Sequence, residues 1–145
     1  MGSKSDMAVM DEAKKMLAKL GIQSDTVVAS AHRTPKKVIA LAQQAEGKYS
    51  VIIAGAGMAA HLPGVIASYT TLPVIGVPID TKSLKGFDSL FSIVQMPPGI
   101  PVATVAIGGA KNAGILAAQI IALSDKKVAG ELKKLKKFMA GGGKV

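Results

Sequence analysis

The sequence predicts a three-layer α/β/α sandwich, and three observations support this class. Its 145 residues suit a single domain, which we place at 1–145. Hydrophobic residues make up 49% of the chain and aromatic residues only 3%, so the apolar residues are mainly aliphatic, as in strands and helices packed in layers. Short apolar runs recur roughly every 25 residues, which leaves room for one crossover helix between successive parallel strands.

The first half of the chain carries clear helix and strand signals. Apolar residues at steps of three and four predict a helix over 7–20, which ends at Gly21. Residues 26–29, with the sequence Thr-Val-Val-Ala, are predicted as a short strand. Thr34 can cap a helix that begins with Pro35 and continues to about residue 47.

The second half repeats this alternation of strand and helix. Predicted strands lie at 50–54, 73–77 and 102–107, and predicted helices at 63–70, 84–95 and 111–123. The strand runs are almost continuously apolar, which is typical of parallel strands covered on both faces. Residues 125–145 are predicted as a lysine-rich helix followed by a glycine-rich tail.

Composition excludes several classes of site. The chain has no cysteine, so it forms no disulfide or thiolate metal site. Without an apolar leader or a long apolar span, we expect a cytoplasmic protein that has no contact with membranes. The net charge of +9 is concentrated in the last helix, where lysines without arginine favour a solvated face over a nucleic-acid site.

Ligands of parallel sheets gather beyond the carboxyl ends of the strands, and three segments lie there. Residues 2–6 offer small residues, hydroxyls and a carboxylate before a helix, which suits either an anion and ribose cradle or simple helix capping. Residues 29–35 contain Arg33, which could hold a phosphate or pair with a structural carboxylate. Residues 55–64 form a predicted loop of small residues that ends at His61 and lets a ligand approach the backbone.

The only two histidines, His32 and His61, fall in these predicted loops at one edge of the sheet. Two histidines without cysteine or a carboxylate pair make a weak metal site, so we expect no metal. Proton transfer suits imidazole better, although a lone histidine is often structural. Neither a nucleophile elbow, a P-loop nor a complete dinucleotide fingerprint occurs, so we expect no cofactor.

Four motifs together resemble the N5-carboxyaminoimidazole ribonucleotide mutases, the class I branch of the AIR carboxylase family. They are residues 2–6, 30–35, 55–64 and 88–97, and the resemblance runs from Met1 to about Leu123. It implies a flavodoxin-like parallel sheet and an isomerase of de novo purine biosynthesis. The substrate's carboxylate would leave its exocyclic nitrogen as carbon dioxide in a closed pocket and be recaptured at ring carbon 4. The resemblance also implies a homo-octamer, with residues 95–97 near a subunit junction.

The resemblance assigns roles to individual residues. His61 matches the catalytic acid/base, Arg33 matches a phosphate ligand, and Ser3 and Asp6 match residues that hold the ribose phosphate. The implied substrate contacts are Gly2, Ser3, Ser5, Asp6, Ser30, Ala31, His32, Arg33, Gly55, Ala56, Gly57, Ala60 and Leu62.

The sequence also departs from the family's pattern. Family members usually carry an apolar strand before Gly2, and this first strand is missing from the sequence. That strand is central in a flavodoxin-like sheet, so its neighbours are expected to lack a partner. Met58 stands where glycine is usual and is expected to narrow the pocket, and residues 108–112 form a shortened loop.

Three alternatives remain open at this point. A class II carboxylase of the same fold would take carbon dioxide directly and use the uncarboxylated nucleotide. A non-enzymatic nucleotide- or RNA-binding module would use the lysine-rich last helix. An inactive version of the mutase would follow if the sheet cannot form without its central strand.

Overall fold

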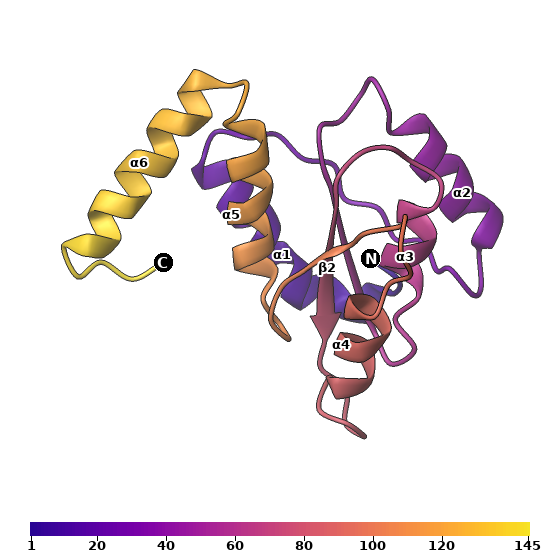
Figure 1. Ribbon diagram of the computed structural model, residues 1–145. Helices are drawn as coiled ribbons and strands as arrows, with labels where there is room; N and C mark the ends of the chain where they lie inside the picture. Colours follow the sequence, from indigo (N-terminus) through magenta and orange to yellow (C-terminus); the bar gives the residue numbers. More distant parts are fainter.

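A computed structural model describes residues 1–145, and its centre is a parallel sheet of three strands. The strands are β1 (Ile52–Gly57), β2 (Val74–Ile79) and β3 (Ala103–Thr104), in the order β1-β2-β3. Every residue of β2 is buried, as expected for the middle strand. Helices cover both faces of the sheet, which confirms the predicted α/β class (Figure 1).

Helices α1 (Met7–Lys19) and α5 (Ala110–Ile121) cover one face of the sheet. Their apolar faces enclose a core with the side chains of β2, and Ile75 and Val77 are fully buried there. The two helices approach closely because Gly114 has no side chain: a Cβ there would lie 3.0 Å from the Ala13 carbonyl oxygen. Small residues therefore set the packing of this layer.

Helices α2 (Pro35–Gln44), α3 (Leu62–Ala67) and α4 (Phe87–Val94) lie on the opposite side of β2 from α1 and α5 (Figure 1). A second core lies between these helices and the sheet. Ile93 is fully buried in it and packs against Gly76 of β2, which has no side chain. The first residue of α4 follows Gly86, whose φ of 83° is left-handed, so this helix begins three residues later than predicted.

The predicted strand at 26–29 is wrong, because these residues are not part of the sheet. Their backbone bonds Met1 instead: the Met1 amino group donates to Val27 O at 2.9 Å, and Ala29 N donates to Met1 O at 2.9 Å. These bonds pair residues 26–29 with a single residue, which does not form a ladder. The predicted strand over 102–107 likewise shrinks to the two residues of β3, which lies at the sheet edge.

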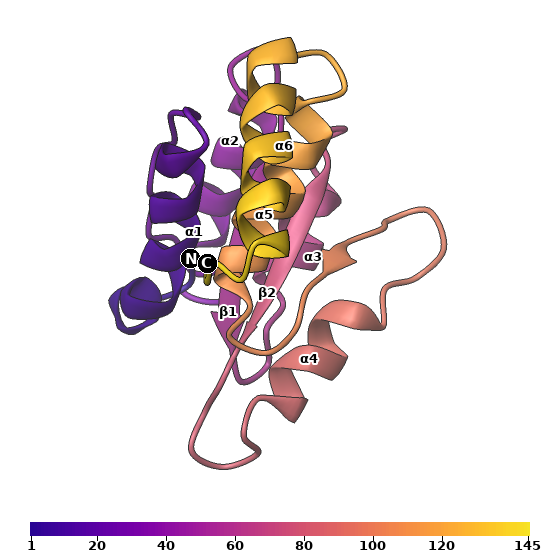
Figure 2. The same cartoon turned by 90° about the vertical axis from the view of Figure 1, so that its left-hand side faces the viewer.

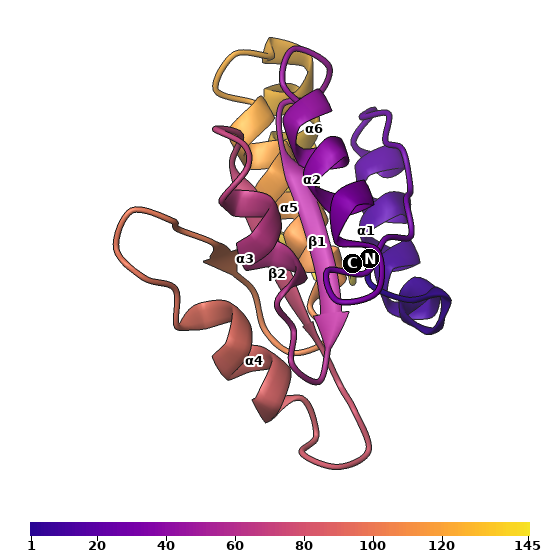
Figure 3. The same ribbon diagram turned by 90° about the vertical axis from the view of Figure 1, so that its right-hand side faces the viewer.

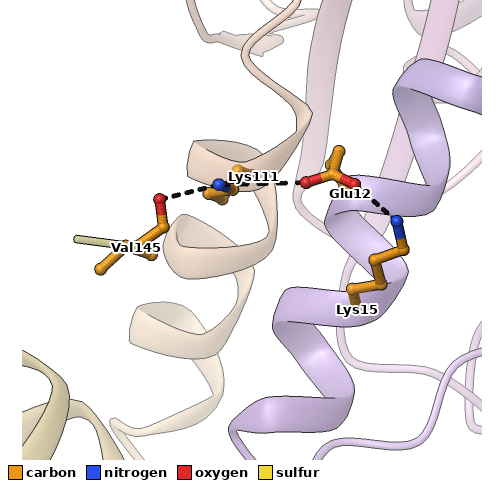
Figure 4. Close-up of polar contacts among 4 residues, drawn as sticks. All are labelled: Glu12, Lys15, Lys111 and Val145. Atoms are coloured by element: carbon orange, nitrogen blue, oxygen red, sulfur yellow. Dashed lines mark hydrogen bonds and ion pairs between the residues drawn. The ribbon is translucent and has the colours of Figure 1, made fainter.

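The last helix, α6 (Lys126–Ala140), packs on α5 (Figure 2). All six of its lysines are exposed. The Asp125 side chain caps it by accepting hydrogen bonds from Lys127 N and Val128 N. The chain end returns to the body of the protein, where Lys111 Nζ donates to Val145 O at 2.8 Å and lies 3.9 Å from Glu12 Oε2 (Figure 4). No helix combines the length and apolar character needed to cross a membrane.

Candidate active site

Three predicted segments meet at one edge of the sheet through hydrogen bonds between them. Gly2 N donates to Gly55 O at 3.2 Å, which joins the first segment to β1. Arg33 Nη2 donates to Gly2 O at 3.2 Å, and His32 Nε2 lies 2.7 Å from His61 Nδ1. The side chains expected to act together are therefore neighbours within a single chain.

The segment at residues 3–6 forms a single 3₁₀ turn, Lys4–Asp6, in front of α1. Ser3 caps this turn: its Oγ accepts from Ser5 N at 3.3 Å, while Asp6 Oδ2 accepts from Ser3 N at 2.9 Å. This reciprocal pair is a capping box. The arrangement fixes the Asp6 carboxylate, only 8% exposed, beside the two serine hydroxyls. The residues predicted to bind a ligand are therefore the same residues that cap this turn.

Residues 30–34 form a tight turn that presents Arg33. Thr34 Oγ1 accepts from Ser30 N at 2.9 Å and donates to Ser30 O at 3.1 Å, so it closes the turn. Thr34 stands at the N-cap position of α2, which begins at Pro35 as predicted, but its hydroxyl is engaged in this turn and makes no capping bond to the helix. The Arg33 guanidinium is exposed and forms no ion pair, and its only bond is to Gly2 O. Most of its five N–H donors are free for an anion.

The two imidazole rings meet edge to face, with centroids 4.9 Å apart and planes at 83°. His61 immediately precedes α3, and its backbone N donates to Ala59 O at 2.8 Å. In a bond between two imidazole nitrogens one must donate and the other accept, so the tautomer of His61 is coupled to that of His32. His61 Nε2 has no partner in the chain, and both rings are exposed.

The prediction that residues 55–57 belong to a loop is wrong, because they form the last half of β1. Gly55 is needed for packing, since a Cβ there would lie 2.3 Å from Met10 Sδ. The side chains of Ala56, Ala60 and Leu62 are buried in the second core. At these three positions a ligand would meet backbone rather than side chains.

Met58 and Ala31 have different surroundings. Met58 has a left-handed φ of 57° and is 67% exposed, so its side chain extends away from the core. Ala31 is half-buried and packs against the second core beside the histidines.

Sequence reasoning missed the segment that follows β2. Thr81 lies against β1, because a Cβ at Gly57 would be 2.9 Å from Thr81 Cγ2. Thr81 Oγ1 donates to Asp88 Oδ2 at 3.2 Å, and Asp88 Oδ1 is buried without a partner. The rule that directed attention to the other strand ends applies here as well: this segment follows the carboxyl end of a parallel strand.

The site is open in a single chain. Both histidines and Arg33 are exposed, and neither histidine nor Arg33 lines the cavity of about 490 Å³ that lies between β1 and residues 21–29. The closed pocket implied by the family resemblance is thus not formed by the residues of one chain alone.

Comparison with known proteins identifies the family. Residues 1–141 match the family model described as AIR carboxylase. The N5-carboxyaminoimidazole ribonucleotide mutase of Saccharolobus solfataricus is 56% identical over 140 residues, which are 96% of this chain and 89% of that relative. The enzyme of the same name from Thermotoga maritima is also 56% identical, over 96% of this chain and 82% of the relative.

The fold comparison agrees with the sequence comparison. The crystal structure of Treponema denticola PurE superposes with a TM-score of 0.89 at 30% identity, covering 98% of this chain and 89% of that chain. The match covers nearly the whole length in sequence and in fold, and the protein belongs to the AIR carboxylase family.

Proposed function

We propose that this protein converts N5-carboxyaminoimidazole ribonucleotide to 4-carboxy-5-aminoimidazole ribonucleotide in the cytoplasm, as a step of purine biosynthesis. The observation that carries this proposal is the contact between His32 Nε2 and His61 Nδ1 at 2.7 Å. It holds one imidazole at a set orientation while leaving its second nitrogen free for proton transfer. The names of the Saccharolobus and Thermotoga relatives support the choice of reaction.

The reaction moves one carboxylate and one proton. The bond between the exocyclic nitrogen and the carboxyl carbon breaks, which releases carbon dioxide, and the nitrogen takes a proton from His61. Ring carbon 4 then attacks the carbon dioxide, and its proton returns to His61 as the new carbon–carbon bond is completed. Protons and charges balance with a single acid/base, and a positioned group of this kind contributes about 10²–10⁴-fold to a rate.

The sugar phosphate would be held away from the reacting ring. Arg33 offers an exposed fork of donors for the phosphate, and the serine hydroxyls and Asp6 carboxylate offer partners for phosphate and ribose oxygens. Binding energy from this remote part of the substrate supports orientation at the imidazole ring. The backbone of residues 55–60 would lie against the base, since its side chains are small.

We extend the proposal to a homo-oligomer, an octamer, whose neighbouring subunits close the site. Helix α4 and the loop after it project from the body of the molecule (Figures 2 and 3). Phe87, Phe91 and Val94 are exposed by 56%, 58% and 48%, and the two rings stack with centroids 6.3 Å apart. An apolar patch of this kind is typical of a surface covered by a partner. Carbon dioxide would be retained only in an enclosed site.

The test of the proposed activity offers each substrate separately to the purified chain. Formation of the carbon-carboxylated nucleotide from the N-carboxylated one, without ATP, supports the mutase. Turnover only of the uncarboxylated nucleotide with bicarbonate would instead establish a direct carboxylase. Light scattering on the same sample measures the assembly, and Phe91→Asp is expected to dissociate it.

The alternative function, a non-enzymatic nucleotide- or RNA-binding module, predicts a different set of results. Salt-sensitive RNA binding that persists in the His61→Asn variant, together with absence of turnover for both substrates, would favour it.

A further inference from the structure

The segment between β2 and α4 turns back on itself, so that the first turn of α4 meets the end of β2. Lys85 and Gly86 have left-handed φ values of 51° and 83°, and these two residues reverse the chain. Lys85 N also donates to Thr81 O at 3.0 Å, which closes the turn. Asp88 thereby comes to lie beside Thr81, although seven positions separate them in the sequence.

Two side-chain hydrogen bonds attach α4 to the carboxyl end of β2. Thr81 Oγ1 donates to Asp88 Oδ2 at 3.2 Å. Ser89 is completely buried, and its hydroxyl donates to Ile79 O at 2.9 Å. Ile79 is paired in the sheet with Gly57, the last residue of β1. The start of α4 is therefore fixed relative to the ends of both strands.

Thr81 also lies directly against the end of β1. A Cβ at Gly57 would be only 2.9 Å from Thr81 Cγ2, so the methyl group of Thr81 packs on the backbone there. From Gly57 the chain continues through three residues to His61. Thr81 thus contacts the starting point of the short segment that carries the imidazole.

Helix α4 reaches the same segment from a second side, through the core. Ile93 is fully buried in one cluster with Ala60 and Leu62, which are the residues on either side of His61 in the sequence. Packed cores transmit displacements because they contain few voids. A shift of α4 would therefore move the backbone on both sides of His61.

The Asp88 carboxylate is poorly suited to stabilising the fold. Its Oδ1 atom is buried and no group of the chain donates to it. Asp88 forms no ion pair either, and its one side-chain partner is the hydroxyl of Thr81. Burial of a carboxylate oxygen without a donor costs free energy. What the carboxylate does provide is a directional bond, which fixes an orientation more narrowly than apolar packing does.

We propose that Thr81 and Asp88 are positioning residues: their hydrogen bond holds α4 against the strand ends and so sets the place of His61 in the site. The inference rests on the proposed function, because His61 is the group that would move the proton. Neither Thr81 nor Asp88 needs to touch the substrate. A displacement of about 1 Å in a reacting group can lower a rate about 100-fold, so a link at this distance can matter for turnover.

Matched substitutions at Thr81 test the role of its hydroxyl. Thr81→Val keeps the shape of the side chain and a methyl group against Gly57 but cannot donate to Asp88. In this variant kcat should fall about tenfold while KM changes less than about threefold, because the phosphate contacts are retained. Thr81→Ser keeps the donor and should recover most of the loss. Unchanged kcat in Thr81→Val, or equal losses in the two variants, would overturn the proposal.

A double variant separates position from stability. Thr81→Val alone leaves the Asp88 carboxylate without its hydroxyl partner and should lower the urea midpoint. Addition of Asp88→Leu replaces both polar partners by apolar groups, and the half-buried position accommodates the larger side chain. The midpoint should then recover while kcat stays low. Recovery of kcat together with the midpoint would show that the bond matters only for folding, and would overturn the proposal.

A measurement without substrate keeps this inference distinct from the proposed reaction. The rings of His32 and His61 lie 4.9 Å apart between centroids, so NMR cross-relaxation between their ring protons reports where His61 lies. The signal should be strong in the parent chain and in Thr81→Ser, and weaker in Thr81→Val. Light scattering should give the same assembly for all three proteins, since Phe87 and Phe91 are unaltered.

The two proposals fail on different results. Equal cross-relaxation in the three proteins would refute the positioning role of Thr81 and Asp88, whatever the parent chain turns over. Absence of turnover in a parent chain that shows the expected cross-relaxation pattern would refute the proposed mutase activity, while the effect of Thr81 on His61 would stand.

Discussion

His32 Nε2 and His61 Nδ1 lie 2.7 Å apart, although 29 positions separate the two residues in the sequence. His32 belongs to the turn before α2 and His61 immediately precedes α3, so packing of these two helices sets the contact. The bond can hold only one proton between the rings, and it leaves two ring nitrogens without a partner, Nδ1 of His32 and Nε2 of His61.

Replacement of His61 by asparagine should abolish most turnover. The variant keeps a polar side chain of similar reach but cannot exchange a proton near neutral pH, so kcat should fall about 10²–10⁴-fold. Substrate affinity, measured by calorimetry, should change less than about threefold because the phosphate contacts are retained. Near-normal kcat in this variant would refute the proton-transfer role.

His32 should act as a positioning residue, because it reaches the reaction through His61. In His32→Ala the Nδ1 atom of His61 loses its partner, and kcat should fall about tenfold to a hundredfold with KM little changed. His32→Gln provides an amide that can bond the same nitrogen and should recover part of the loss. Equal activity of the two variants would show that the contact is structural only.

Arg33→Lys should raise KM more than it lowers kcat. Lysine keeps the positive charge but lacks the planar fork that suits a phosphate, and loss of about 1.4 kcal/mol of binding corresponds to a tenfold higher KM. Steady-state kinetics on Arg33→Ala should show a larger increase. If the lysine variant matched the parent chain, the phosphate would have to be held elsewhere.

Met58→Gly should stabilise the protein by up to about 1 kcal/mol, because glycine adopts the left-handed φ of 57° without steric cost. The methionine side chain is 67% exposed and contributes little packing. Urea denaturation gives the change, and Met58→Ala serves as the control with no expected gain. A loss of stability in the glycine variant would mean that the side chain packs on something outside the single chain.

Glu46 should make the protein less stable in acid. The Thr71 backbone N–H at 2.7 Å, and then the hydroxyls of Thr71 and Thr70, hold the pKa of Glu46 below its ordinary value of 4.5. The native state thus favours the charged carboxylate: its contribution is complete above pH 4.5 and is lost as the pH falls through the lowered pKa.

The measurement for Glu46 is the urea midpoint between about pH 6 and pH 3, compared with Glu46→Gln. The glutamine does not titrate, so the variant should lose less stability over this range. Parallel curves for the two proteins would contradict the assignment. Other carboxylates, such as Glu12, titrate in both proteins and cancel in the comparison.

The helices could be predicted from the sequence because the spacing of apolar residues along one helix is a local pattern. Apolar residues at steps of three and four placed α1 to within one residue. Four short motifs indicated the family, which the comparisons confirm, and the site residues taken from these motifs stay a prediction. The family assignment itself rests on the match of residues 1–141 to the family model and on the relatives.

Only the tertiary structure decided which segments pair as strands and which side chains meet. Residues 26–29 have the composition of a strand, yet their backbone bonds only Met1 and they form no strand of the sheet. Residues 55–57 look like a loop because of their glycines, but pairing with β2 makes them a strand. The bond between His32 and His61 likewise depends on contacts distant in sequence, which local composition does not encode.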